Sequence, residues 1–157
     1  MGSNQPKSRR GKSFTPEQDM AICYAYLNIT QDLTIDNSQS SGHFWDRIYQ
    51  HYIRSTSDDA RSQGSIKSRW GIIMKCCNKF LGFLTQVQNA HQSGMTDTNV
   101  VLQAKLMYMK IEKKPFTFDH CWGILESSIK WQQLPNTSSR TNTPTTMTNF
   151  IDQSATQ

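Results

Sequence analysis

The chain has 157 residues, a formal net charge of +5 at pH 7 and a pI near 9.1, and hydrophobic residues make up 36% of it. This length fits one domain with tails, since domains usually run to roughly 100 to 150 residues. No stretch approaches the ~18 uncharged apolar residues of a membrane span, so we expect no membrane contact. The four cysteines lie in apolar runs and no signal peptide is visible, which favours a reducing compartment inside the cell.

Both ends of the chain differ in composition from its middle. Residues 1–12 carry four basic residues and no acid, and we expect them to form a flexible basic arm. Residues 132–157 are dominated by Thr, Ser, Asn and Gln, which predicts a disordered polar tail. The sequence therefore predicts that residues 13–131 fold.

A first helix is predicted to begin at Thr15 and to end near Leu27. Thr15 is a suitable N-cap, Pro16 suits the first helical position, and Gln18 can reach back as in a capping box. Apolar residues recur at helical spacing and predict the buried face: Met20, Cys23, Tyr24 and Leu27. A long polar loop is expected over residues 28–40.

A second helix, predicted over about residues 42–54, has an aromatic face. Its apolar residues follow one another at steps of three and four, which places them on one side. They are Phe44, Trp45, Ile48, Tyr49 and Tyr52. We expect this face to pack against the first helix.

A third helix is predicted over about residues 65–90, and its two faces differ. One stripe is apolar: Ile66, Trp70, Ile73, Cys77, Phe80 and Leu84. The opposite face carries Ser68, Gly71, Ile72, Lys75 and Lys79. Between Arg61 and Leu84 there are five basic residues and no acid, which suits an anionic partner.

Two further helices are predicted towards the C-terminal side. The first covers about residues 97–114, with Pro115 as its stop, and a shorter one covers about residues 119–129. Four apolar residues of this last segment are interpreted as additional core: Trp122, Ile124, Leu125 and Trp131. No alternating strand pattern occurs, so the predicted fold class is all-α.

Three segments together resemble a known family. Residues 10–19 (RGKSFTPEQD) are similar to the opening of a Myb repeat, and the resemblance continues through residues 44–48 and 65–70. The long first loop and the additional helices resemble the trihelix variant. Residues 78–82, 92–94, 118–122 and 130–131 are similar to Myb/SANT-like proteins related to the accessory protein of Harbinger-type transposons. The resemblance covers about residues 10–131 and implies a three-helix helix-turn-helix bundle extended by one or two C-terminal helices.

This resemblance implies a DNA-binding module in the nucleus, either a transcription regulator or a transposon-derived accessory protein, with double-stranded DNA as its partner. The base-reading positions of Myb repeats correspond to Lys67, Ser68 and Gly71. Ser and Gly stand where strongly base-reading repeats have Asn, so phosphate contacts are expected to dominate. The residues expected to supply them are Arg69, Lys75 and Lys79 of the third helix and Arg9, Arg10 and Lys12 of the arm.

Several alternatives accompany this interpretation. A SANT-like module that docks a transposase or another nuclear protein is the second candidate, although the basic third helix favours DNA. The four cysteines and four histidines do not show zinc-ligand spacing, so no metal and no cofactor are expected. No catalytic signature is recognised, and we expect no enzyme. Residues 7–12 are compatible equally with a nuclear import signal and with a solubilising tail.

Overall fold

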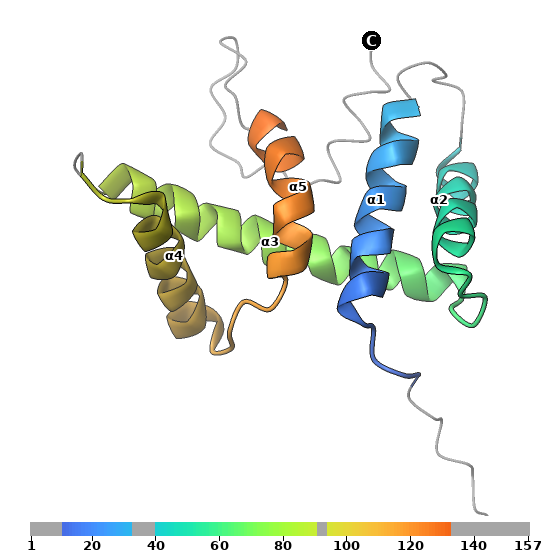
Figure 1. Cartoon of the computed structure of the whole chain (residues 1–157), viewed down its shortest axis with the longest axis horizontal. Coiled ribbons are helices and arrows are strands. Elements are labelled where there is room, and N and C mark those ends of the chain that lie inside the picture. The colour runs from blue at the N-terminus through green and yellow to red at the C-terminus, as the bar shows by residue number, and fades with distance from the viewer. Residues whose placement is uncertain (1–10, 33–39, 91–93, 133–157) are drawn as a thin grey trace, which may run out of the picture.

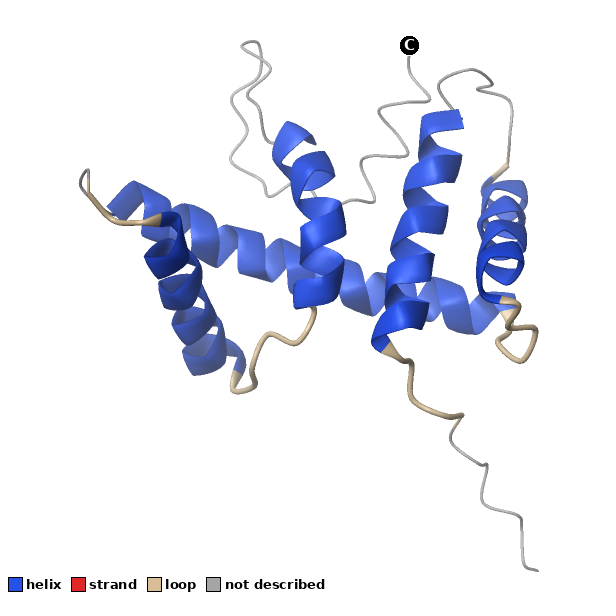
Figure 2. Cartoon of the chain, in the orientation of Figure 1, coloured by secondary structure: helices blue, strands red, loops and turns tan. Residues whose placement is uncertain are grey.

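The computed structural model describes residues 11–32, 40–90 and 94–132, and within these ranges the chain is entirely helical. The five helices are α1 (Pro16–Asp32), α2 (Ser41–Thr56), α3 (Gln63–Ala90), α4 (Asp97–Glu112) and α5 (Asp119–Gln132). Figure 1 shows that α3 runs along the folded part, that α5 crosses it near its middle and α1 crosses it nearer α2, and that α4 packs at the end opposite α2. Figure 2 shows helices and connecting loops but no strand over the described residues. The predicted all-α class is therefore confirmed.

Local sequence signals determine where the helices begin. The predicted capping box of α1 is present: the Gln18 amide donates to Thr15 Oγ1 at 3.2 Å, and the Thr15 amide donates to Gln18 Oε1 at 3.0 Å. Ser40 caps α2 by accepting from the His43 amide at 3.4 Å. Thr96 caps α4 by accepting from the Asn99 amide at 3.3 Å. Each cap satisfies a backbone amide that the helix itself leaves without an acceptor.

The N-terminal half of α3 packs under an aromatic cluster from the first two helices. The rings of Tyr26 and Trp70 stack with their centroids 4.0 Å apart, and Phe44 meets Tyr26 edge-on at 5.6 Å. Trp45 lies 6.0 Å from Tyr26 and is 8% exposed. The predicted core role of Trp45 and Trp70 is confirmed.

A second aromatic cluster covers the C-terminal half of α3. Phe80 stacks on Phe116 at 4.4 Å and meets Trp122 edge-on at 5.0 Å, while Phe83 packs against Tyr108 at 5.9 Å. These rings come from α3, α4, α5 and the loop between α4 and α5. Because α3 supplies apolar residues to both clusters, it ties the five helices into one core.

The boundaries differ most from the prediction at the end of α1, and those of the other helices differ by no more than three residues at either end. α1 continues to Asp32 instead of ending near Leu27, because Ile29 and Thr30 are buried and the packing they gain outweighs the weak helix propensity of Thr. α4 ends at Glu112, before the predicted Lys114, because Lys113 adopts a left-handed conformation with φ 62°. The predicted tail begins at 132, but Gln132 is the last residue of α5; residues 133–157 lie outside the described residues.

The buried face of α1 also differs from the prediction. Met20 is only half-buried and Tyr24 is 49% exposed, whereas the helix buries Asp19, Ile22 and Tyr26. The helix is thus rotated about its axis relative to the prediction. The cause is the ion pair between Asp19 and Arg69 of α3, which requires the Asp19 side of α1 to face inward. None of the described helices has the length and apolar character required to cross a membrane.

We predict that Trp70→Ala severely destabilises the domain. Trp70 is 6% exposed and loses its stacking on Tyr26 when truncated, and such truncations of buried aromatic residues cost about 3 to 5 kcal/mol. A thermal or urea unfolding curve followed by circular dichroism measures the loss. A curve identical to that of the wild type would contradict the packing described here.

Candidate functional site

A buried ion-pair network joins α1, α3 and α5. Arg69 donates from Nε to Asp19 Oδ1 at 2.7 Å and from Nη2 to Asp19 Oδ2 at 2.9 Å. His120 Nε2 lies 3.1 Å from Asp19 Oδ2. The Asp19 side chain is only 2% exposed, whereas those of Arg69 and His120 are each 23% exposed. A bidentate contact of this kind is geometrically specific and holds the three helices in register.

The Arg69 side chain is therefore held by contacts within the fold. Its hydrogen bond with Asp19 raises the pKa of the guanidinium, and its side chain also lies over the rings of Phe118 at 4.9 Å and Phe14 at 5.2 Å. Sequence reasoning had placed Arg69 among residues that supply charge to an external partner. In the structure two of the five guanidinium N–H donors bind Asp19, so Arg69 has a defined role within the fold.

Among the described residues, one group of side chains could hold a metal ion: Asp19, His120 and Cys121. Their ligand atoms lie within 4.8 Å of one another. The carboxylate already accepts from Arg69 and contacts His120, so its oxygens are engaged in the network. The Cys121 thiol is a hydrogen-bond partner of Cys23, and this contact together with burial raises the pKa of the Cys23 thiol. Both thiols are fully buried, so they act as core groups and not as exposed nucleophiles.

The predicted basic face of α3 is partly present. Lys67, Ser68, Gly71 and Lys75 are all exposed, and a Cβ at Gly71 would meet no atom within 4 Å. Lys67 Nζ lies 5.8 Å from the centroid of the Trp45 ring. We call these four residues the basic face of α3. It presents two cations, a hydroxyl group and uncovered backbone to solvent.

Lys79 does not extend this face. Its ammonium group forms an ion pair with Glu112 Oε2 at 2.7 Å, so it binds α3 to α4. Lys12 is exposed, whereas Arg9 and Arg10 lie outside the described residues together with most of the predicted basic arm. Nuclear import through residues 7–12 stays a prediction.

Sequence reasoning missed a second arginine with a defined partner set. Arg61 donates to the Ser13 carbonyl at 3.0 Å and to Gln18 Oε1 at 3.1 Å, and its guanidinium lies 3.8 Å from the centroid of the Phe14 ring. These contacts fix the start of α1 against the loop that precedes α3. No periodicity in the sequence identifies such a contact, because the partners are separated by more than 40 positions.

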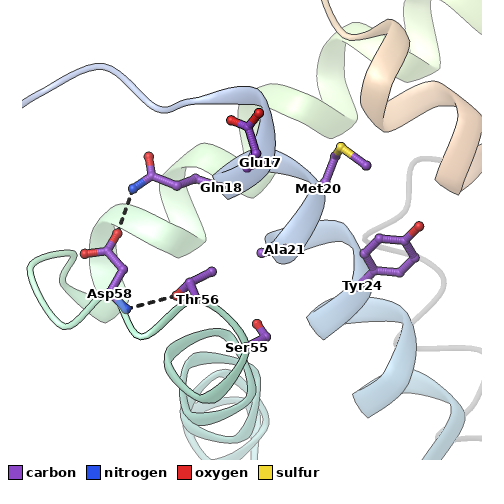
Figure 3. A pocket seen from close by; sticks show the side chains of 8 residues that line it. All are labelled: Glu17, Gln18, Met20, Ala21, Tyr24, Ser55, Thr56 and Asp58. Carbon is purple, nitrogen blue, oxygen red and sulfur yellow. Dashed lines mark hydrogen bonds between the residues drawn. The ribbon is translucent and has the colours of Figure 1, made fainter.

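A pocket of about 490 Å³ lies between the start of α1 and the end of α2 (Figure 3). It is lined by Glu17, Gln18, Met20, Ala21, Tyr24, Ser55, Thr56 and Asp58. Much of its polar lining is internally bonded: Gln18 Nε2 donates to Asp58 Oδ2 at 2.7 Å, and Thr56 Oγ1 accepts from the Asp58 amide at 3.2 Å. The lining includes two carboxylates and no cation, which disfavours an anionic ligand.

The chain is similar to two curated proteins from Arabidopsis thaliana. It is 28% identical over 131 residues to Glutathione S-transferase T3 and 29% identical over 130 residues to Glutathione S-transferase T2. The aligned regions cover 82% and 80% of this chain but 22% of each relative, so the chain spans about a fifth of the length of these proteins. No family model matches the chain, and no solved structure matches it.

These comparisons correct the functional expectations. The chain's relatives are named transferases, which contradicts the Myb/SANT-like, trihelix-type interpretation and the DNA-binding or SANT-type docking function derived from it. The same finding contradicts the expected partners, which were double-stranded DNA and a transposase or another nuclear protein. It also contradicts the expectation that the chain is not an enzyme. The error has a physical basis: an apolar stripe opposite a basic face describes how a helix packs, and helices with different functions share this pattern.

We predict that Asp19→Asn lowers the free energy of unfolding by about 2 to 4 kcal/mol. The substitution keeps the shape but removes the charge that compensates Arg69, and breaking a buried pair from one side is costly. Part of that cost is reduced by solvent, since Arg69 is partly exposed. Denaturant unfolding measures the change.

Asp32→Asn is the matched control. Asp32 pairs with Arg47 at 3.3 Å, but its side chain is 62% exposed, so this substitution should cost no more than about 1 kcal/mol. Equal losses for the two variants would show that the Asp19 network does not hold the fold together.

Proposed function

We propose that the chain is a helical module of a glutathione S-transferase-type protein and that it takes part in glutathione-dependent transfer. One observation carries this proposal: about 130 residues, four-fifths of the chain, align with each of two proteins of that name. The aligned part is about a fifth of those proteins, so the chain is proposed to act as one part of such a protein.

The basic face of α3 is the described surface that suits glutathione. This tripeptide carries more carboxylates than amines and is therefore anionic at neutral pH. Lys67 and Lys75 can pair with its carboxylates, Ser68 can donate a hydrogen bond, and Gly71 leaves room for the ligand to approach the helix. The pocket between α1 and α2 is less suitable, because Glu17 and Asp58 line it without a cation.

Lys67 and Lys75 would also increase the reactivity of the glutathione thiol. A thiol attacks an electrophile as the thiolate, and a neighbouring cation lowers the pKa of the thiol and so increases the thiolate fraction. Lys67 and Lys75 are separated by eight positions, which is about 12 Å along a helix. In this proposal they bind the two ends of an extended tripeptide and place its sulfur near a positive charge.

The test is a titration of the chain with glutathione, followed by NMR chemical shifts of the backbone amides. We expect saturable shifts at residues of the basic face of α3 and a dissociation constant in the millimolar range, since the surface is open to solvent. Lys67→Glu with Lys75→Glu should weaken binding at least about tenfold, equivalent to ~1.4 kcal/mol. The transfer itself is measured as the rate of thioether formation between glutathione and an electrophilic chromophore, with the chain present and with glutathione alone.

Lys110→Glu is the matched control, because Lys110 is also an exposed lysine but lies on α4, and the substitution changes the net charge of the chain in the same direction. Its binding should stay close to that of the wild type. An absence of saturable shifts at all accessible concentrations, together with a thioether rate equal to that of free glutathione, would overturn the proposal.

A further inference from the structure

Four side chains with metal-ligand chemistry meet where α1 packs against α5. The ligand atoms of Asp19, His120 and Cys121 lie within 4.8 Å of one another. The Cys23 thiol joins them, because it is a hydrogen-bond partner of Cys121. The set unites a carboxylate, an imidazole and two thiols, and each of these groups is a ligand of Zn²⁺ in proteins. We call Asp19, Cys23, His120 and Cys121 the α1–α5 cluster.

Each of the two helices supplies two members of the cluster. Asp19 and Cys23 are four positions apart on α1, so their side chains lie one above the other on the same side of the helix. His120 and Cys121 are consecutive in the first turn of α5. The spacing of cysteines and histidines along the sequence does not reveal the cluster, because its members come from two helices about 100 positions apart and one of them is a carboxylate.

The distances within the cluster suit a tetrahedral ion. Bonds of about 2.0 to 2.3 Å place the ligand atoms of a tetrahedral zinc site roughly 3.3 to 3.8 Å apart. His120 Nε2 and Asp19 Oδ2 are 3.1 Å apart, and the limit of 4.8 Å holds for the Cys121 sulfur as well. Adjustments of the side chains by about 1 Å therefore suffice to surround an ion.

Arg69 holds the carboxylate of the cluster in place. It donates from Nε to Asp19 Oδ1 and from Nη2 to Asp19 Oδ2. A carboxylate oxygen has two lone pairs, so Oδ2 can accept from Arg69 and still direct its second lone pair towards His120. Carboxylates that bind metals are typically hydrogen-bonded to a further residue, which orients them. The pair of Asp19 and Arg69 thus positions one ligand.

The charges of such a site balance. Before an ion binds, Asp19 and Arg69 compensate each other and the buried thiols of Cys23 and Cys121 are neutral. A divalent ion takes the place of the two thiol protons, which pass to solvent, and both sulfurs bind it as thiolates. His120 binds as the neutral imidazole, with its proton on the other ring nitrogen. The charges of the ion, the two thiolates, the carboxylate and the guanidinium then cancel, so no uncompensated charge enters the core.

We propose that the α1–α5 cluster binds one Zn²⁺ ion and that this ion joins α1 to α5. Four protein ligands leave no position open for a substrate, so the site is structural. The side chains of His120 and Arg69 are each 23% exposed and mark the side from which the ion enters. The inference does not depend on the proposed function, because the cluster shares no residue with the basic face of α3.

Titration of the full chain with Co²⁺, in the absence of glutathione, tests the site. Co²⁺ replaces Zn²⁺ in tetrahedral sites, and thiolate ligands then give charge-transfer absorption in the near ultraviolet. We expect saturation at about one ion per chain, release of about two protons per ion at pH 8, and loss of the absorption when Zn²⁺ is added. Zn²⁺ should also raise the midpoint of thermal unfolding, because it binds the folded state. A thiol assay first establishes that the four cysteines are reduced.

Cys121→Ser removes one thiolate and should weaken Co²⁺ binding at least about 100-fold, since changes to residues that only orient a ligand already cost roughly 10- to 100-fold. Cys76→Ser is the matched control, because Cys76 is also a buried thiol but contacts Tyr108 of α4. This variant should bind Co²⁺ like the wild type. Circular dichroism without metal establishes that both variants are folded.

His120→Ala keeps the test decisive if Cys121→Ser does not fold, because the His120 side chain is partly exposed and its removal leaves the pair of Asp19 and Arg69 intact. We expect this variant to bind Co²⁺ at least about tenfold more weakly than the wild type. The inference is wrong if the reduced wild type shows no thiolate-to-cobalt absorption at ~1 mM Co²⁺. Unchanged binding by His120→Ala, or equal losses for Cys76→Ser and Cys121→Ser, would contradict it as well.

Discussion

The buried pairing of Asp19 with Arg69 is the constraint on which the arrangement of the helices depends. A carboxylate that is 2% exposed is stable only when an opposite charge compensates it, so α1 and α3 must meet with these side chains aligned. His120 contacts the same carboxylate and brings α5 to the same place. The pair thus determines the rotation of α1, and with it which aromatic residues reach the core. Tyr26 turns inward to stack on Trp70, while Tyr24 remains in solvent.

The length of α3 gives the fold its shape. Its 28 residues exceed what a single aromatic cluster can cover, so its two halves pack under different groups of helices. The Lys79–Glu112 ion pair and the stacking of Phe80 on Phe116 join α4 and the following loop to the second half. As a result, charged residues that lie on one side of α3 have different roles: Lys67 and Lys75 remain available in solvent, and Lys79 is used within the fold.

Two surfaces of the fold are available for contacts with other molecules, and they differ in chemistry. The basic face of α3 is polar and cationic and suits a small anionic ligand, whereas α4 exposes four large apolar side chains, Leu102, Leu106, Met109 and Ile111. The similarity to part of the two transferases gives the basic face its proposed ligand. Because the surfaces lie on different helices, a substitution in one should leave the other intact.

Local signals in the sequence were sufficient for the all-α class, for the capping box of Thr15 and Gln18, and for the apolar stripe of α3 that includes Trp70, because these features depend on neighbours within a few positions. The exposure of Lys75 followed from the same periodicity. The functional interpretation did not follow, since a packing pattern does not identify a ligand. Only the tertiary structure decided that α1 buries Asp19, that Arg69 is held by it, and that Lys79 pairs with Glu112. These contacts join residues 50 and 33 positions apart, and a pairing over such a distance in the sequence leaves no trace in a local pattern.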